Sequence, residues 1–194
     1  MKKLIYALTL TVFANTSFAA GETKEKYTVD TNASEVKWTG YHLAKSYEHW
    51  GTVNLKSGNL ELEGDKIVGG EFVVDMNSIT NGDIQDDPKD KAKLEKHLKS
   101  DDFFNAKKFP ESTLKIKSAT KTGSKYDITA DLTIRGITKE IKFDATGNSA
   151  GDSYTFDAVV KIDRTAHEVM YGWKVENAIL SDEFKLDIKL VAKK

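Results

Sequence analysis

The chain has 194 residues, no cysteine and nearly balanced charge, with 29 basic against 30 acidic side chains. The lack of cysteine excludes disulfides, thiol catalysis and lipidation of an N-terminal cysteine, and the slightly acidic balance disfavours nucleic acid as a partner. Since the chain has no Pro/Gly-rich linker, charge block or internal repeat, its length indicates one domain.

The N-terminal segment has the pattern of a secretory signal peptide. Two lysines precede an apolar stretch from Leu4 to Phe13, and Ala19 stands where a signal peptidase would cut. The apolar run is too short for a stable membrane span. We therefore expect a signal peptide over residues 1–19 and a soluble single domain over residues 20–194, located in the periplasm or, as the alternative, secreted.

Beyond this segment, apolar and polar residues alternate with the period of two that is typical of half-buried strands. Turn residues such as Ser57-Gly58, Thr122-Gly123 and Arg135-Gly136 separate successive segments and indicate an up-and-down meander. The predicted strands are Tyr27–Asp30, Glu35–Leu43, His49–Lys56, Asn59–Glu63, Ile67–Asp75, Ser112–Ser118, Tyr126–Ile134, Lys139–Thr146, Ser153–Ile162 and Ser181–Val191.

The segment from Asn77 to Glu111 breaks the alternation with a polar loop and one predicted helix, Pro88–Lys99. Asp86 or Asp87 is suited to cap the helix, and Pro88 suits its first turn. A short amphipathic helix inserted between strands is well placed to close one end of a barrel. We predict that this segment forms a lid through the apolar residues Leu94, Leu98, Phe103 and Phe104.

Strands with one apolar face either stack as a sandwich or close as a barrel, and only a barrel encloses a long cavity. The inward rows contain small residues, Gly40, Ala130, Ala145 and Ala158, which favour a cavity over a filled interior. Nine residues of strand would give a lumen about 30 Å long. The predicted lumen residues are Trp38, Phe72, Val74, Leu114, Ile116, Ile128, Leu132, Phe156, Phe184 and Ile188.

The case for catalysis or a metal site is poor. The four histidines, His42, His49, His97 and His167, show no spacing typical of a metal site or a hydrolase, and no serine lies in a nucleophile elbow. We predict no catalytic residues, no metal and no cofactor.

Two polar residues continue inward rows toward a barrel end and are candidates to contact a ligand's head group. His42 follows Trp38 and Gly40, and Arg164 ends the row that begins at Tyr154. Each has a structural alternative: a histidine bonded to backbone, and an arginine that pairs with Asp163 or stabilises a turn. Arg135, beside a glycine, is most simply a turn residue.

Several stretches, spread over nearly all of the domain, have a familiar order and spacing. These stretches are Ser34-Glu35-Val36-Lys37-Trp38 leading to His42 and Gly51, His97 to Phe104 followed by Phe109-Pro110, Asp131 to Lys139, and Ile162-Asp163-Arg164. Together they resemble the YceI-like family of bacterial periplasmic proteins. At one place the sequence departs from the family: His167 and Glu168 stand where many members carry an aromatic residue and a glycine.

The resemblance implies an all-β fold, a lipocalin-like extended eight-stranded antiparallel β-barrel with a short helical insertion. It also implies binding of a long apolar lipid in the lumen, either a polyisoprenoid or an isoprenoid quinone. The leading hypothesis is therefore a periplasmic lipid carrier without catalysis. Transient membrane contact and self-association are compatible with it.

Two alternatives come from other classes of protein. One is an enzyme that acts on a lipid or a small exported substrate with His42 as base. The other is a stress-linked interaction protein that uses the barrel only as a scaffold, for which an exposed apolar patch would be the sign.

Overall fold

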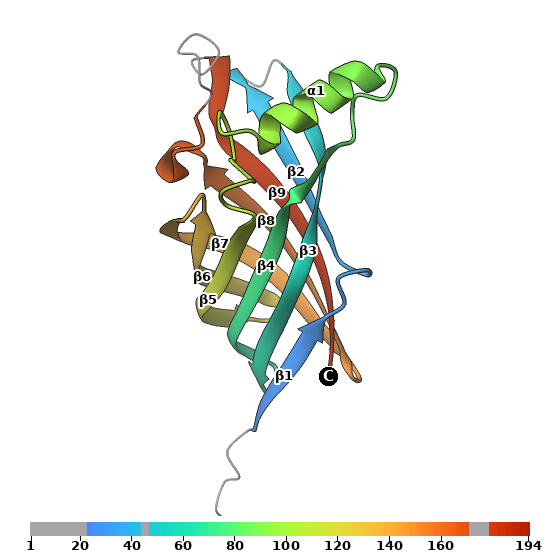
Figure 1. Cartoon of the computed structure of the whole chain (residues 1–194). Coiled ribbons are helices and arrows are strands. Elements are labelled where there is room, and N and C mark those ends of the chain that lie inside the picture. The colour runs from blue at the N-terminus through green and yellow to red at the C-terminus, as the bar shows by residue number, and fades with distance from the viewer. Residues whose placement is uncertain (1–22, 44–46, 171–178) are drawn as a thin grey trace, which may run out of the picture.

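The computed structural model describes residues 23–43, 47–170 and 179–194, so the predicted signal peptide lies outside the described residues. Nine antiparallel strands form one sheet (Figure 1). The strands are β1 (Lys24–Val29), β2 (Glu35–His42), β3 (Glu48–Glu63), β4 (Lys66–Asn81), β5 (Glu111–Thr122), β6 (Lys125–Ile134), β7 (Ile137–Ala150), β8 (Ser153–Asp163) and β9 (Leu180–Lys193).

The sheet closes into an eight-stranded barrel, as predicted. The strands β2 to β9 follow one another around the wall, and β2 pairs with β9, where Trp38 faces Leu186. At the lower end in Figure 1, β1 takes the place of β2 and pairs with both β3 and β9. The strands β1 and β2 thus share one position in the wall, so that β3 and β9 are paired along most of their length.

One predicted turn is wrong. We expected Ser57-Gly58 to separate two strands, but both belong to β3, with a register shift between Leu55 and Ser57. Gly58 is there because of packing: an added Cβ would lie 2.9 Å from a ring carbon of Phe72 on β4. The glycine that suggested a turn instead allows two strands to approach closely at a bulge.

The predicted polar loop from Asn77 is also wrong at its start, because β4 continues to Asn81. The register shifts where Asn54 pairs with Asp75, and the backbone N–H of Asn54 donates to the Ser78 hydroxyl at 2.7 Å. Side-chain oxygens here replace part of the backbone ladder, so the sequence loses its alternation while the chain stays extended.

The predicted helix is confirmed with its bounds, α1 (Pro88–Lys99), followed later by the short 3₁₀ helix η2 (Thr165–His167). The Asp87 carboxylate accepts from the N–H groups of Lys89 and Asp90 and caps α1. Figure 1 shows α1 lying across the upper end of the barrel, and we call this end the mouth. No helix among the described residues is both long and apolar enough to cross a membrane.

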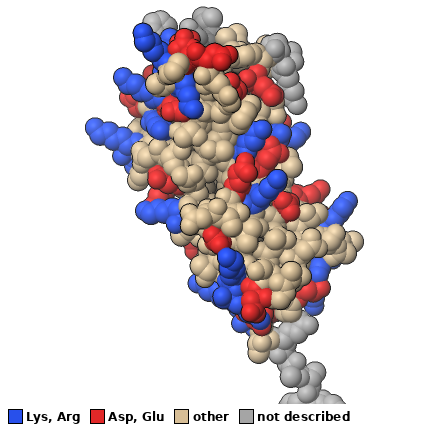
Figure 2. All heavy atoms as spheres, turned by 90° about the vertical axis from the view of Figure 1, so that its right-hand side faces the viewer, with Lys and Arg blue, Asp and Glu red and all other residues tan. Residues whose placement is uncertain are grey.

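The exterior of the wall carries mixed charge. On the face drawn in Figure 2, the basic and acidic side chains of the described residues intermingle, with uncharged surface between them. Lys117, for example, lies 2.7 Å from Glu140 across β5 and β7. Exposed pairs of this kind contribute little to stability.

Candidate functional site

An apolar cavity of about 390 Å³ occupies the upper part of the barrel, a size typical of ligand pockets. On β9 its lining runs from Leu180 to Leu190. Ten residues of strand rise about 33 Å, or about 25 Å along the axis of a barrel with strands tilted by about 40°. Nine of the ten predicted lumen residues line it: Trp38, Phe72, Val74, Leu114, Ile116, Leu132, Phe156, Phe184 and Ile188.

The tenth predicted residue, Ile128, does not line the cavity. It is 1% exposed and belongs to the same buried core cluster as Tyr27, Tyr126 and Tyr154, which fill the lower barrel. We call this filled part the floor. The Tyr154 hydroxyl donates to the Tyr126 hydroxyl at 2.9 Å, and Tyr126 donates to the Asp65 carbonyl at 2.7 Å. The floor therefore closes the lower end with satisfied polar groups.

Only one of the four small inward residues lines the cavity. Ala130, Ala145 and Ala158 are buried in the core cluster, and of the four small residues only Gly40 lines the cavity. We expected all four to widen the lumen. The alanines instead belong to the buried core cluster, where Ala130 pairs with Ile116 and Ala158 pairs with Ile188. This arrangement agrees with the alternation of small and large residues that fills narrow barrels.

The predicted lid residues, Leu94, Leu98, Phe103 and Phe104, all line the cavity near the mouth. Phe103 packs edge-on against Phe104, which in turn contacts Phe184 of β9 at a centroid distance of 6.3 Å. Arg135, which we assigned only to a turn, also donates from Nη1 to the Phe103 carbonyl. It ties the segment after α1 to the β6–β7 turn.

The predicted head-group residue His42 lines the cavity at the mouth. Its ring packs edge-on against Tyr47 at 5.4 Å, and Tyr47 packs in the same way against His49 at 4.8 Å. His49 also lines the cavity, and its Nδ1 lies 2.8 Å from Asp83 Oδ2. Sequence reasoning named His49 only among the histidines without the spacing of a metal site. It missed Asp83, because a register shift in β4 brings the two residues together.

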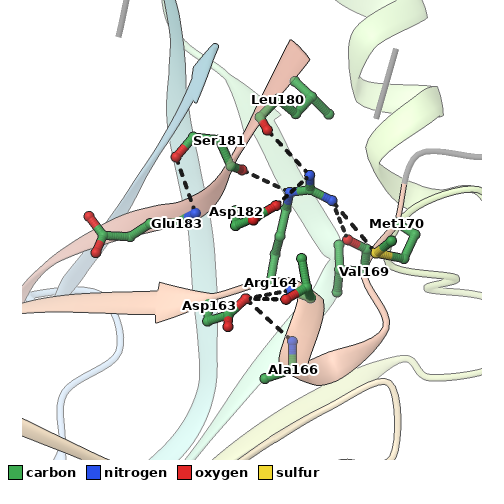
Figure 3. Close-up of polar contacts among 10 residues, drawn as sticks. Asp163, Arg164, Ala166, Val169, Met170, Leu180, Ser181, Asp182 and Glu183 are labelled. Atoms are coloured by element: carbon green, nitrogen blue, oxygen red, sulfur yellow. Dashed lines mark hydrogen bonds and ion pairs between the residues drawn. The ribbon is translucent and has the colours of Figure 1, made fainter. Parts of the chain in front are cut away.

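Arg164, the second predicted head-group residue, lines the cavity, but its guanidinium is engaged mainly by neighbouring residues of the protein (Figure 3). It is 3% exposed, and its guanidinium donates to the carbonyls of Ser181 at 2.8 Å and Val169 at 2.9 Å. It also donates to the Asp182 carboxylate at 3.3 Å. Burial lowers the pKa of Arg164, against the opposing effect of Asp182. These contacts favour the structural role, in which Arg164 joins the end of β8 to the start of β9.

The loop after Arg164 contains His167 and Glu168, the two residues at which the sequence departs from the family pattern. His167 is 1% exposed, and its Nδ1 lies 3.0 Å from the Ile137 carbonyl, so it is a buried structural residue. Glu168 has φ 55° and ψ 28°, the left-handed conformation that favours glycine. Neither Glu168 nor His167 lines the cavity.

No group of three or more metal-ligating side chains lies within the part of the chain that the structure describes. The predicted base His42 lies next to Tyr47, while the carboxylate Asp83 is hydrogen-bonded to His49. The site thus combines a long apolar cavity with a few polar groups gathered at one end, which is suited to hold an apolar chain with a small head.

Comparison with known proteins agrees with this architecture. The model of the YceI-like domain matches residues 27–192. Protein YceI of Escherichia coli O157:H7 is 32% identical over 155 residues, covering 78% of this chain and 76% of that protein, and a UPF0312 protein of Pseudomonas putida is 31% identical over the same shares. The crystal structure of BcnA from Burkholderia cenocepacia has a TM-score of 0.71 at 24% identity, covering 85% of this chain and 99% of that chain. A Campylobacter jejuni YCEI protein has a TM-score of 0.55 at 18% identity, covering 100% and 93%. The chain belongs to the YceI-like family.

Proposed function

We propose that the protein binds and carries a long apolar lipid of the isoprenoid type, a polyprenyl chain or an isoprenoid quinone, without changing it chemically. The observation that carries this proposal is the apolar cavity, which extends from the mouth to the floor and has the lid residues at its upper end. The YceI-like family is a family of barrel binding proteins and not a known enzyme family, which supports a binding role.

The shape of the cavity suits a slender chain. Its lining crosses the barrel from Phe184 near the mouth to Leu190 and Phe156 near the floor. Each buried CH₂ group contributes about 0.8 kcal/mol before the costs of ordering are subtracted. The tail would therefore supply most of the affinity, and affinity should rise with tail length until the tail reaches the floor.

The protein carries this lipid in the periplasm, where a water-insoluble molecule needs a protein to cross an aqueous space. The support is the signal-like sequence of residues 1–19. Cell fractionation tests the location: the protein should appear in the periplasmic fraction with residues 1–19 removed.

A matched pair of valine substitutions tests the binding role. Val74→Trp on β4 fills the cavity, whereas Val159→Trp on β8 adds the same ring at a position that is 55% exposed on the outer face. We expect Val74→Trp to weaken the binding of an isoprenoid quinone at least tenfold and Val159→Trp to leave it unchanged. Equal binding by both variants would mean that the lipid does not occupy the lumen.

The enzyme alternative has a separate test. If His42 acts as a base, His42→Ala abolishes turnover of the lipid while the bound lipid remains. If the protein is a carrier, the bound lipid remains chemically unchanged both in the wild-type protein and in His42→Ala. The scaffold alternative predicts a large exposed apolar patch that serves as the interaction surface.

A further inference from the structure

A fixed histidine–carboxylate pair lies at the mouth of the cavity. His49 is on β3 and Asp83 follows β4, with Nδ1 of His49 2.8 Å from Oδ2 of Asp83. The other carboxylate oxygen accepts from the Trp50 N–H at 2.8 Å and from the Asn81 side-chain amide at 2.5 Å. Tyr47 packs against the His49 ring at 4.8 Å. The imidazole of His49 is thus held by a hydrogen bond to Asp83 and by ring packing against Tyr47.

The charge state of Asp83 determines which nitrogen of His49 carries a proton. Burial would raise the pKa of Asp83, but the hydrogen bonds from Trp50, His49 and Asn81 outweigh it and hold that pKa below its ordinary value. An ionised carboxylate only accepts, so His49 Nδ1 must be the donor. In the neutral ring Nε2 is then an acceptor. No described residue forms a hydrogen bond with Nε2.

Space for a ligand group lies beside this ring. His49 faces Gly40 across the β2–β3 pair, and both line the cavity. A Cβ built on Gly40 meets no atom within 4 Å. Its neighbours in the same inward row, Trp38 and His42, carry large rings. The missing side chain therefore leaves a gap in the lining next to an imidazole of fixed orientation.

We propose that this gap holds the head group of the bound lipid, and that the neutral imidazole of His49 accepts a hydrogen bond from it at Nε2. The inference rests on the proposed lipid-binding function. An acceptor in this position selects a head group that donates, such as the hydroxyl of an isoprenoid alcohol or of a quinol. It disfavours a quinone carbonyl or an ionised phosphate, since both only accept. Asp83 is a positioning residue, which sets the tautomer of His49.

The test compares ligands with one tail and different heads. Farnesol and its methyl ether share the tail, and only farnesol donates a hydrogen bond; a short-tailed ubiquinol and its quinone form a second pair under anaerobic conditions. We expect the wild-type protein to bind the donor of each pair roughly fivefold more tightly, the ratio that one net hydrogen bond gives. If the donor binds more tightly in both pairs, the protein recognises the hydroxyl that farnesol and the quinol share. If the donor binds more tightly in only one pair, the donor of that pair is the preferred ligand.

Variants assign the preference to a residue. His49→Phe keeps an aromatic ring without an acceptor, so it should abolish the preference and leave the affinity for the methyl ether unchanged. Asp83→Asn should reduce the preference, because an amide also stabilises the other tautomer of His49. Gly40→Val should weaken the binding of both ligands by filling the gap. His42→Phe is the matched control at the mouth and should keep the preference.

The outcomes separate this inference from the proposed function. If wild-type protein binds none of the four ligands, the lipid-binding function fails. If it binds farnesol and the ether equally, or if His42→Phe rather than His49→Phe removes the preference, the head-group assignment is overturned while lipid binding stands. Binding of the ether by His49→Phe also shows that this variant is folded.

Discussion

The tyrosine pair in the floor leads to a prediction about two substitutions that each remove one hydroxyl. Tyr126 and Tyr154 are 1% and 2% exposed. Tyr154→Phe loses one hydrogen bond, and Tyr126 still donates to the Asp65 carbonyl. The cost should be about 1 kcal/mol. Tyr126→Phe loses both bonds and leaves the buried Tyr154 hydroxyl without its acceptor, which should cost about 3 kcal/mol.

Thermal unfolding measures the difference. For a domain of this size, 1 kcal/mol shifts Tm by about 2–4 °C, so Tyr154→Phe should lower Tm by about 2–4 °C and Tyr126→Phe by about 6–12 °C. The double variant should be more stable than Tyr126→Phe alone, because it removes the orphaned hydroxyl. The argument about orphaned polar groups is refuted if the two single variants lose equal stability or if Tyr154→Phe loses more.

Three further predictions concern the loop that joins β8 to β9. Arg164→Ala should lower the free energy of unfolding by about 3 kcal/mol, because several buried carbonyls lose their donor, and a urea titration that finds less than 1 kcal/mol would contradict this structural role. Glu168→Gly should raise stability by up to about 1 kcal/mol, since it relieves the left-handed backbone at φ 55°; a loss of stability would mean that the Glu168 side chain contributes contacts of its own. The hydroxyl of Thr165, with the N–H groups of Thr165 and Ala166, holds the pKa of Asp163 below its ordinary value. The resulting stabilisation is fully present at a pH above the ordinary pKa of the unfolded chain, and it is lost as the pH falls through the lower pKa of the folded protein. Asp163→Asn should therefore flatten the acid side of the stability profile, and an unchanged slope would rule out this contribution.

The sequence predicted the features that depend on local pattern. The bounds of α1 followed from Pro88 and the capping Asp87, and the inward rows of the strands followed from alternation alone. The resemblance to a family settled the choice between sandwich and barrel, which alternation leaves open. The helix bounds and the inward rows could be predicted because each depends only on residues that are neighbours in the sequence.

The features that sequence reasoning missed depend on register between strands. The role of Gly58 requires knowing that Phe72 lies opposite, and the pairing of His49 with Asp83 requires the shifted register of β4. The alanines of the inward rows could be placed on the inner face but not at a height in the barrel. The larger side chains packed around an inward alanine decide whether it widens the cavity.

Native mass spectrometry, combined with organic extraction, tests the central claim most directly. The protein should be purified from its own cells without detergent, so that its lipid is neither displaced nor replaced. We predict a stoichiometric apolar adduct that extraction identifies as an isoprenoid lipid. A bare polypeptide that also takes up no isoprenoid alcohol, quinol or quinone when these are offered would contradict the claim that the cavity is a lipid-binding site.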